Sequence, residues 1–201
     1  MDRIMDIINV IKSRRSVRKY RSDPVRREDI ITILDAAHAA PSAMNHKPWE
    51  FLVITGEKIL EMGESFLPIV EQFSAGWKSS NVGGSISRNE FLTFARYYGG
   101  APVVIMIVYE KQSIPNFQKA YLESASAAME NLLLAATALG LGTCWMTGPL
   151  ADEESLRGIL DIPETKEIVA VTPVGYPLET PGSGADQYSG ADLESKIRWI
   201  E

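Results

Sequence analysis

Apolar residues recur at helical spacing in two early segments of the chain. The first spacing predicts a short helix that ends at about Ser13, with apolar positions Ile4, Ile7, Ile8 and Ile11. In the second segment Asp23 is the expected N-cap, Pro24 takes the first helical position and Pro41 ends the helix. The apolar stripe of this second helix comprises Ile30, Ile33, Leu34 and Ala37.

Other apolar runs are short and rich in β-branched residues, which is typical of buried strands. They are "WEFLVIT" (Trp49 to Thr55) and "APVVIMIVYE" (Ala101 to Glu110), followed later by "GTCWMTG" and "EIVAVTPVGYP". Between the first two, we expect a helical region over about 60–100 that contains a Gly/Ser/Asn-rich lid, Ser79 to Asn89. Helices and strands in this order predict an α+β fold.

A long helix is expected from about Asn116 to Leu139, with small and apolar residues around most of its circumference. Such a helix needs cover on all sides. Glu130 and Asn131 interrupt the apolar stretch, which argues against a membrane span. The charged last stretch, "GADLESKIRWIE", is expected to be a terminal arm.

Composition limits the classes of function. The 201 residues are 45% hydrophobic, which suits one domain over residues 1–201. The net charge of -6 argues against a nucleic-acid partner. Cys144 is the single cysteine, so no internal disulfide forms, and with no secretory signal pattern in the first residues we expect a cytoplasmic protein.

The segment "RRSVRKY", Arg14 to Tyr20, concentrates positive charge directly behind the first predicted helix. It is compatible with a solvated basic face, a nucleic-acid patch or a pocket for one phosphate monoester. Guanidinium groups, a serine hydroxyl and backbone N–H groups together satisfy the oxygens of a dianionic phosphate. The acidic net charge disfavours the nucleic-acid interpretation, and the other two stay open from these residues alone.

Two later motifs also carry both a structural and a functional interpretation. "APSAMNHKPWEF" (Ala40 to Phe51) either caps a helix and packs Trp49 in the core, or reads the edge of a planar heterocycle with its polar turn. "GLGTCWMTG" (Gly140 to Gly148) is either a tight helix-to-strand turn or a backbone that approaches a flat ligand. Within the second motif, Cys144 is expected to be a small buried hydrophobe with no cation beside it, and therefore an inert thiol.

In this order the motifs resemble those of the FMN-dependent nitroreductase-like flavoproteins, the NAD(P)H-dependent flavin oxidoreductase superfamily. The resemblance covers nearly the full chain and includes "AAMENLLLAATALGLGTCWMTG" and the late "VGYP". It implies a central, mostly antiparallel β-sheet flanked by helices, with a long buried interface helix. It also implies an intertwined homodimer whose two FMN sites are each built from both chains.

The resemblance assigns cofactor-binding roles residue by residue. Arg14 and Ser16 correspond to ligands of the FMN phosphate, Arg15 lies at the same end, and Arg18 corresponds to the cation near flavin N1 and O2. Residues expected to line the flavin from the other subunit are Pro41, Ser42, Ala43 and Asn45. The strand-end residues Met146, Thr147 and Gly148 correspond to those that pack against the ring, with the Thr147 N–H near N5 and Trp145 beside it.

Two departures from the family pattern concern the cofactor. Lys47 stands where the family usually has glutamine before the Pro-Trp pair. The family also supplies a late cation for the phosphate, whereas here the stretch after Pro177 contains Asp186 and Gln187 and no cation before Lys196. Either Arg14, Arg15 and Lys196 suffice, or FMN is held more weakly than usual.

The implied reaction is ping-pong hydride transfer from NADH or NADPH through flavin N5 to a nitroaromatic, quinone or similar electron-poor acceptor. No side chain acts as a nucleophile and no metal is expected; His38 and His46 are expected to be structural. Two alternatives stay open: a flavin-fragmenting, benzimidazole-forming enzyme of the same fold, and a non-catalytic flavin-binding protein.

Overall fold

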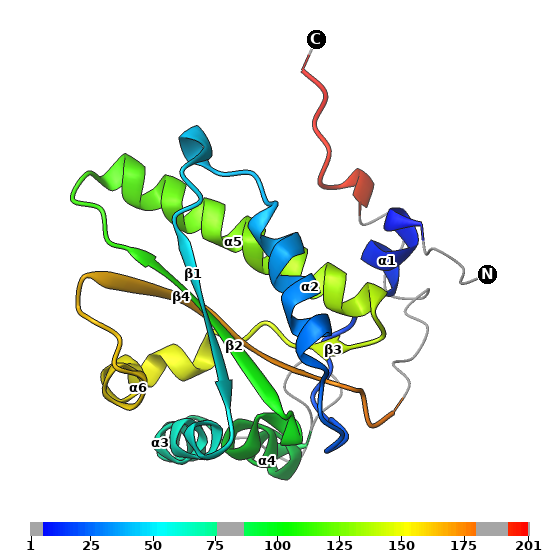
Figure 1. Ribbon diagram of the computed structural model, residues 1–201, viewed down its shortest axis with the longest axis vertical. Coiled ribbons are helices and arrows are strands. Elements are labelled where there is room, and N and C mark those ends of the chain that lie inside the picture. Colours follow the sequence, from blue (N-terminus) through cyan, green and yellow to red (C-terminus); the bar gives the residue numbers. More distant parts are fainter. Residues whose placement is uncertain (1–5, 76–86, 180–192, 201) are drawn as a thin grey trace.

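A four-stranded antiparallel sheet forms the centre of the computed structural model, which describes residues 6–75, 87–179 and 193–200 (Figure 1). The strands are β1 (Trp49–Thr55), β2 (Val103–Glu110), β3 (Gly142–Thr143) and β4 (Lys166–Gly175). Their order is β1-β2-β4-β3, and each neighbouring pair is antiparallel. The predicted α+β fold with a mostly antiparallel sheet is confirmed.

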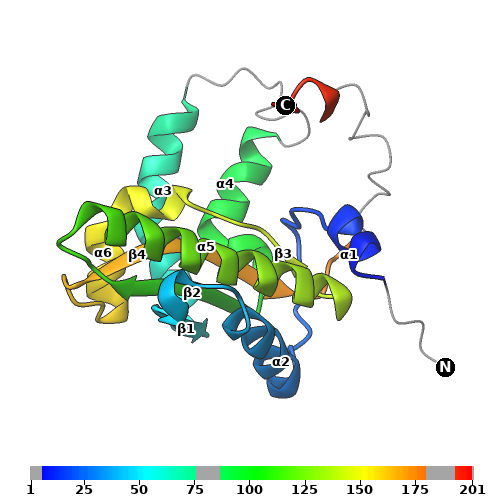
Figure 2. The same cartoon turned by 90° about the horizontal axis from the view of Figure 1, so that it is seen from above.

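Helices cover both faces of the sheet (Figures 1 and 2). One face packs against α2 (Arg27–His38) and α5 (Pro115–Ala138), and the other packs against α3 (Glu57–Ser74), α4 (Arg88–Tyr97) and α6 (Glu153–Leu160). Strand β2 is buried from Val103 to Tyr109 because its alternate side chains enter the two cores. The described part of the chain also contains three short 3₁₀ segments, η1 (Ala43–Asn45), η2 (Tyr98–Gly100) and η3 (Gly148–Asp152).

Helix α5 confirms the long helix predicted between Asn116 and Leu139. Its stripe of small and apolar residues is buried against the sheet and α2: Ala125, Ala128, Met129, Leu132, Leu133 and Ala136. The rest of the chain does not cover the apolar surface of α5 completely, because Leu122 and the C-cap residue Leu139 keep 43% and 41% of their surface exposed. Helices α3 and α4 lie where the sequence predicts a helical region, whereas residues 79–86 of the predicted lid lie outside the described residues.

Two predicted boundaries are wrong. Helix α2 begins at Arg27 with Arg26 as its N-cap, because Asp23 instead accepts a 2.8 Å hydrogen bond from Nε of Arg21. The predicted strand over Gly142 to Gly148 pairs as a ladder only at Gly142–Thr143. After an isolated bridge between Met146 and Val171, the chain turns into η3, whose Pro149 has no N–H to donate to a ladder.

The two ends of the described chain differ. Helix α1 (Ile7–Ser13) packs against α5 and confirms the first predicted helix, although Ile4 lies outside the described residues. The segment 193–200 extends away from the sheet (Figure 1), and the side chain of Trp199 is 84% exposed. None of the helices within the described ranges is both long and apolar enough to cross a membrane.

Candidate cofactor site

The cationic segment Arg14–Tyr20 runs as an extended chain beside β3. Arg14 closes α1 by donating its backbone N–H to Val10, after which Ser16 bridges Thr143 and the N–H of Val17 bonds the Thr143 carbonyl at 2.8 Å. Alternate residues of an extended chain point to opposite sides, so Arg14, Ser16 and Arg18 share one side. These are three of the four residues of this segment to which the family resemblance assigns cofactor-binding roles; the fourth is Arg15.

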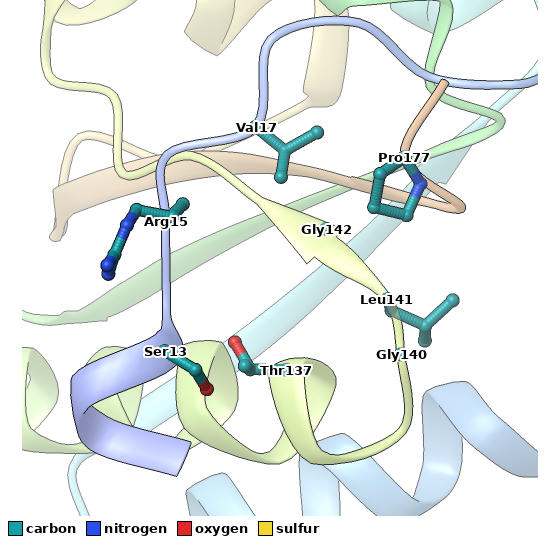
Figure 3. A pocket seen from close by; sticks show the side chains of 8 residues that line it. All are labelled: Ser13, Arg15, Val17, Thr137, Gly140, Leu141, Gly142 and Pro177. Atoms are coloured by element: carbon teal, nitrogen blue, oxygen red, sulfur yellow. The ribbon is translucent and has the colours of Figure 1, made fainter. Parts of the chain in front are cut away.

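Val17 points to the other side, toward Gly142 (Figure 3). A Cβ atom on Gly142 would lie 2.8 Å from the Cβ and both methyl groups of Val17. Glycine at 142 therefore allows the cationic segment to approach β3. The end of the segment is fixed as well, because the N–H of Tyr20 donates to Gly99 and the buried Tyr20 hydroxyl donates to Val17.

A small pocket lies on this second side of the segment. Figure 3 shows it beside the C-terminal end of α5, and its volume is about 210 Å³. It is lined by Ser13, Arg15, Val17, Thr137, Gly140, Leu141, Gly142 and Pro177. Arg15 thus lies on the opposite side from Arg14 and Ser16, and its Nη1 donates to the backbone carbonyls of Lys12 and Arg14 at 2.8 and 2.5 Å.

The guanidinium groups of the segment differ in what they contact. Arg14 Nε is 3.7 Å from Oε1 of Glu130 on α5. Arg18 is exposed, and its Nη1 donates a marginal 3.5 Å hydrogen bond to the Ser16 carbonyl. The Ser16 side chain is exposed too. A phosphate at this surface would meet one hydroxyl and the guanidinium groups of Arg14 and Arg18.

Cys144 is buried beneath these groups. Burial raises the pKa of its thiol, while Arg18, a hydrogen bond with Ser16 and Arg14 act in the opposite direction. The expectation that no cation stands near this cysteine is therefore wrong, because the extended segment brings two arginines over it. The expected consequence still holds: burial dominates, and the pKa stays above that of an ordinary thiol.

The predicted flavin-lining turn has an unusual backbone. Met44, Asn45 and Lys47 adopt left-handed conformations with φ of 52°, 57° and 46°. Such conformations are costly for residues other than glycine and persist where neighbouring contacts hold them. Here the hydroxyl of Ser42 accepts from the N–H of Lys47 at 2.9 Å, and the N–H of Ala43 donates to Ser124 at 3.0 Å.

Both histidines have side-chain partners. Nε1 of the buried Trp49 donates to Nδ1 of His38 at 3.2 Å, which gives His38 a structural contact and confirms core packing by Trp49. Nδ1 of His46 is 2.7 Å from the Tyr121 hydroxyl on α5. Lys47, in the place of the family's glutamine, has a half-buried side chain.

The strand-end residues continue from β3. Met146 is buried and exchanges two backbone hydrogen bonds with Val171. Thr147 and Gly148 are exposed at the start of η3, and a Cβ atom at Gly148 would lie 3.0 Å from the ring of Phe66 on α3. Trp145 is half-buried. Thr147 and Gly148 are therefore accessible to a ligand that lies against the end of β3.

Within one chain, the turn and the cationic segment lie apart from each other. The turn contacts α5 at Ser124, whereas Arg14 reaches α5 at Glu130 and α1 lies toward the C-terminal end of that helix (Figures 1 and 2). The predicted residues Pro41, Ser42, Ala43 and Asn45 thus form a second group. Sequence reasoning missed the contact of Glu130 with Arg14; its signal was a carboxylate within the mostly apolar second half of α5.

Together, the antiparallel sheet between two helical layers and the arginine–serine segment along its short edge strand define an α+β protein with a candidate anion-binding surface. The sequence profile of the Nitroreductase family matches residues 11–176. The chain belongs to this family.

Individual relatives agree with this assignment. The chain is 37% identical over 184 residues to a Methanothermobacter thermautotrophicus protein provisionally named NADH dehydrogenase/NAD(P)H nitroreductase, covering 89% of this chain and 81% of the relative. It is 29% identical to an iodotyrosine deiodinase of Thermotoga neapolitana, covering 85% and 88%. Among solved structures, an FMN-dependent nitroreductase from Clostridium difficile superposes with a TM-score of 0.69 at 26% identity, covering 96% and 98%.

Proposed function

We propose that the chain is an NAD(P)H-dependent FMN oxidoreductase that reduces nitroaromatic, quinone or similar electron-poor acceptors. The observation that carries the proposal is the extended segment beside β3, which presents Arg14, Ser16 and Arg18 on one side within a Nitroreductase-family chain. The solved relative from Clostridium difficile is described as FMN-dependent, which supports the choice of cofactor.

The residues present fit an FMN molecule. A terminal phosphate suits the Arg14 guanidinium and the hydroxyl of the exposed Ser16, and the exposed residues Thr147 and Gly148 suit a flat ring. Arg18 lies on the same side of the segment as Arg14 and Ser16, and its positive charge would stabilise negative charge on a reduced ring. When bound, FMN supplies the group that accepts hydride from NADH or NADPH and passes electrons onward.

The proposal includes a homodimer. A second chain would bring the turn Pro41–Asn45 to a cationic segment that its own chain does not reach. Apolar surface is available for such an interface, because α1 exposes Ile7, Ile8 and Ile11, α5 exposes Leu122, and its C-cap residue Leu139 is exposed as well. Burial of exposed apolar side chains is the usual driving force for an obligate interface.

Purified protein tests the proposal directly. We expect a flavin absorbance spectrum, FMN rather than FAD on release by denaturation, and NAD(P)H oxidation that depends on a quinone or nitroaromatic. Loss of flavin during turnover with oxygen would favour a benzimidazole-forming enzyme instead. Yellow protein that never oxidises NAD(P)H would favour a non-catalytic flavin-binding protein, and protein unable to bind FMN would contradict the proposal.

Reductive deiodination is a second candidate reaction, favoured by the similarity to the Thermotoga neapolitana iodotyrosine deiodinase over 85% of this chain. Incubation of the reduced protein with 3-iodotyrosine separates the two candidates. Iodide release faster than quinone or nitroaromatic reduction would favour the deiodinase. We expect the opposite order.

A further inference from the structure

Glu130 places a carboxylate beside the guanidinium that we assign to the FMN phosphate. Its Oε1 lies 3.7 Å from Arg14 Nε, within ion-pair distance and beyond the length of a hydrogen bond. The two side chains remain 27% and 45% exposed for Arg14 and Glu130 respectively, so both are accessible to a ligand at this surface.

This contact distinguishes Arg14 from the other arginines of the segment. Arg15 donates to backbone carbonyls of Lys12 and Arg14, and Arg18 makes its marginal bond to the Ser16 carbonyl. Among the described residues, neither Arg15 nor Arg18 forms an ion pair with a carboxylate. The cation expected to hold the phosphate is therefore the one that already has an anionic neighbour.

We propose that Glu130 competes with the FMN phosphate for Arg14 and thereby sets how strongly the chain distinguishes FMN from riboflavin, which lacks the phosphate. The inference rests on the proposed function and adds a specificity-determining residue to it. Glu130 acts on the cofactor through Arg14 and is not assigned a contact with the flavin.

Three effects fix the expected sign. The carboxylate neutralises part of the charge on Arg14, and it repels a phosphate monoester that carries about -1.5 to -2 charges near pH 7. Both effects weaken FMN binding. Glu130 also restrains the Arg14 side chain, which favours binding, but a 3.7 Å contact without a hydrogen bond gives little directional hold. The first two effects therefore dominate.

The composition of the chain makes this competition more consequential. From Leu178 to Ser195 the sequence contains no Lys or Arg, so the late cation of the family pattern is missing from that stretch. Arg14 then contributes a larger share of the attraction for the phosphate. Because Glu130 weakens the attraction of Arg14 for the phosphate, little other attraction compensates for the loss. The natural chain should therefore discriminate only weakly between FMN and riboflavin.

Fluorescence titration of flavin-stripped protein with FMN and, separately, with riboflavin tests the proposal. Glu130→Gln keeps the shape of the side chain and removes its charge. We expect the variant to bind FMN about two- to fivefold more tightly, the size typical of an exposed ion pair, with riboflavin affinity unchanged. In an Arg14→Ala background the same substitution should give a clearly smaller gain.

Glu123→Gln is the matched control, since Glu123 also lies on α5 but pairs with Lys119 at 3.6 Å. The proposal is overturned if Glu130→Gln fails to tighten FMN binding, if riboflavin affinity rises equally, if Glu123→Gln has the same effect, or if the gain persists in full without Arg14. A natural chain that binds no FMN at all would instead overturn the proposed function, and the inference with it.

Discussion

Lys19 Nζ lies 2.8 Å from Oε1 of Glu90, and this ion pair joins the cationic segment to the first turn of α4. Glu90 also completes a capping box, accepting hydrogen bonds from the N–H and hydroxyl of Ser87 through its second oxygen. One carboxylate therefore both begins α4 and ties that helix to the residues next to Arg18. The placement of α4 and the course of the cationic segment depend on each other.

This relationship predicts a pH-dependent contribution to stability. The hydrogen bond from Lys19, together with those from Ser87, lowers the pKa of Glu90 from 4.5 to about 2. A depressed folded-state pKa means that the contribution is complete above the unfolded pKa of 4.5 and is lost as pH falls toward 2. Thermal unfolding at several pH values should show Glu90→Gln less stable at neutral pH, with the difference shrinking below pH 4.5.

The control for this prediction is Glu61→Gln on α3. Glu61 forms an ion pair of the same 2.8 Å length with Lys58, but within a single helix and outside any capping box. Its substitution should change stability little at any pH. A constant difference between Glu90→Gln and the natural chain across the whole range would contradict the assigned role of the ionised carboxylate.

The two ends of the arginine–serine segment should respond differently to substitution. If Arg14 holds the FMN phosphate as proposed, Arg14→Ala removes a charge-assisted hydrogen bond worth about 1.5–3 kcal/mol, or roughly ten- to hundredfold in FMN affinity. Arg18→Ala should leave phosphate binding largely intact and lower the reduction potential of the flavin, because negative charge on the reduced ring loses a neighbouring cation. Flavin titration and potentiometry on both variants measure this contrast. Equal small effects on affinity with no change in potential would instead favour the interpretation of the segment as a solvated basic face.

Glycine at 142 should be required by the neighbouring valine. Gly142→Ala places a methyl group 2.8 Å from three carbon atoms of Val17, which is overpacking and typically costs about 1–3 kcal/mol. We expect a lower melting temperature and weaker FMN binding, since the cationic segment must move away from β3. Val17→Ala in the same chain removes two of the contacting carbons and should restore part of both losses; no rescue would place the cause elsewhere.

The proposed dimer is tested on the exposed part of α5. Leu122→Glu puts a charge where 43% of the side-chain surface is open, so the single chain tolerates it while an apolar interface does not. Size-exclusion chromatography should show a monomer without bound flavin. Leu60→Glu, on α3 and 50% exposed, serves as a control that should leave the dimer intact. A substitution at Ala128 would not discriminate, because Ala128 is already buried within one chain.

Local patterns sufficed for most of the elements. The β-branched run at Val103–Tyr109 and the spacing of Ile30, Ile33 and Ala37 fix a strand and a helix face whatever surrounds them. The N-cap of α2 could not be predicted. The side chain of Asp23 can accept a hydrogen bond either from a helix N–H or from Arg21, both nearby in the sequence, and in the structure it accepts from Arg21. The short length of β3 depends on pairing with β4, which no local pattern contains.

The candidate site was predictable to a smaller extent. The division of the segment into two sides, with Arg15 opposite Arg14, Ser16 and Arg18, was not predicted, whereas the choice of these four residues as candidates was predictable from the motif "RRSVRKY". Contacts between distant residues were not: Glu130 beside Arg14 and Tyr121 beside His46 lie 116 and 75 positions apart in the chain respectively. Such pairs are set by the packing of α5 against the segments that cross it.

Alternate side chains of strand β2 enter two different cores. Val103, Ile105, Ile107 and Tyr109 enter the core shared with α2 and α5, whereas Val104, Met106 and Val108 enter the core shared with α3, α4 and α6. A one-residue deletion here would exchange the two sets, sending every later side chain to the wrong layer. On β4 the chain already absorbs one such step, where the register shifts opposite Ile107 and Val108. Tolerance to insertion and deletion should therefore be lowest in β2, and its amides should be among the last in the chain to exchange with deuterium.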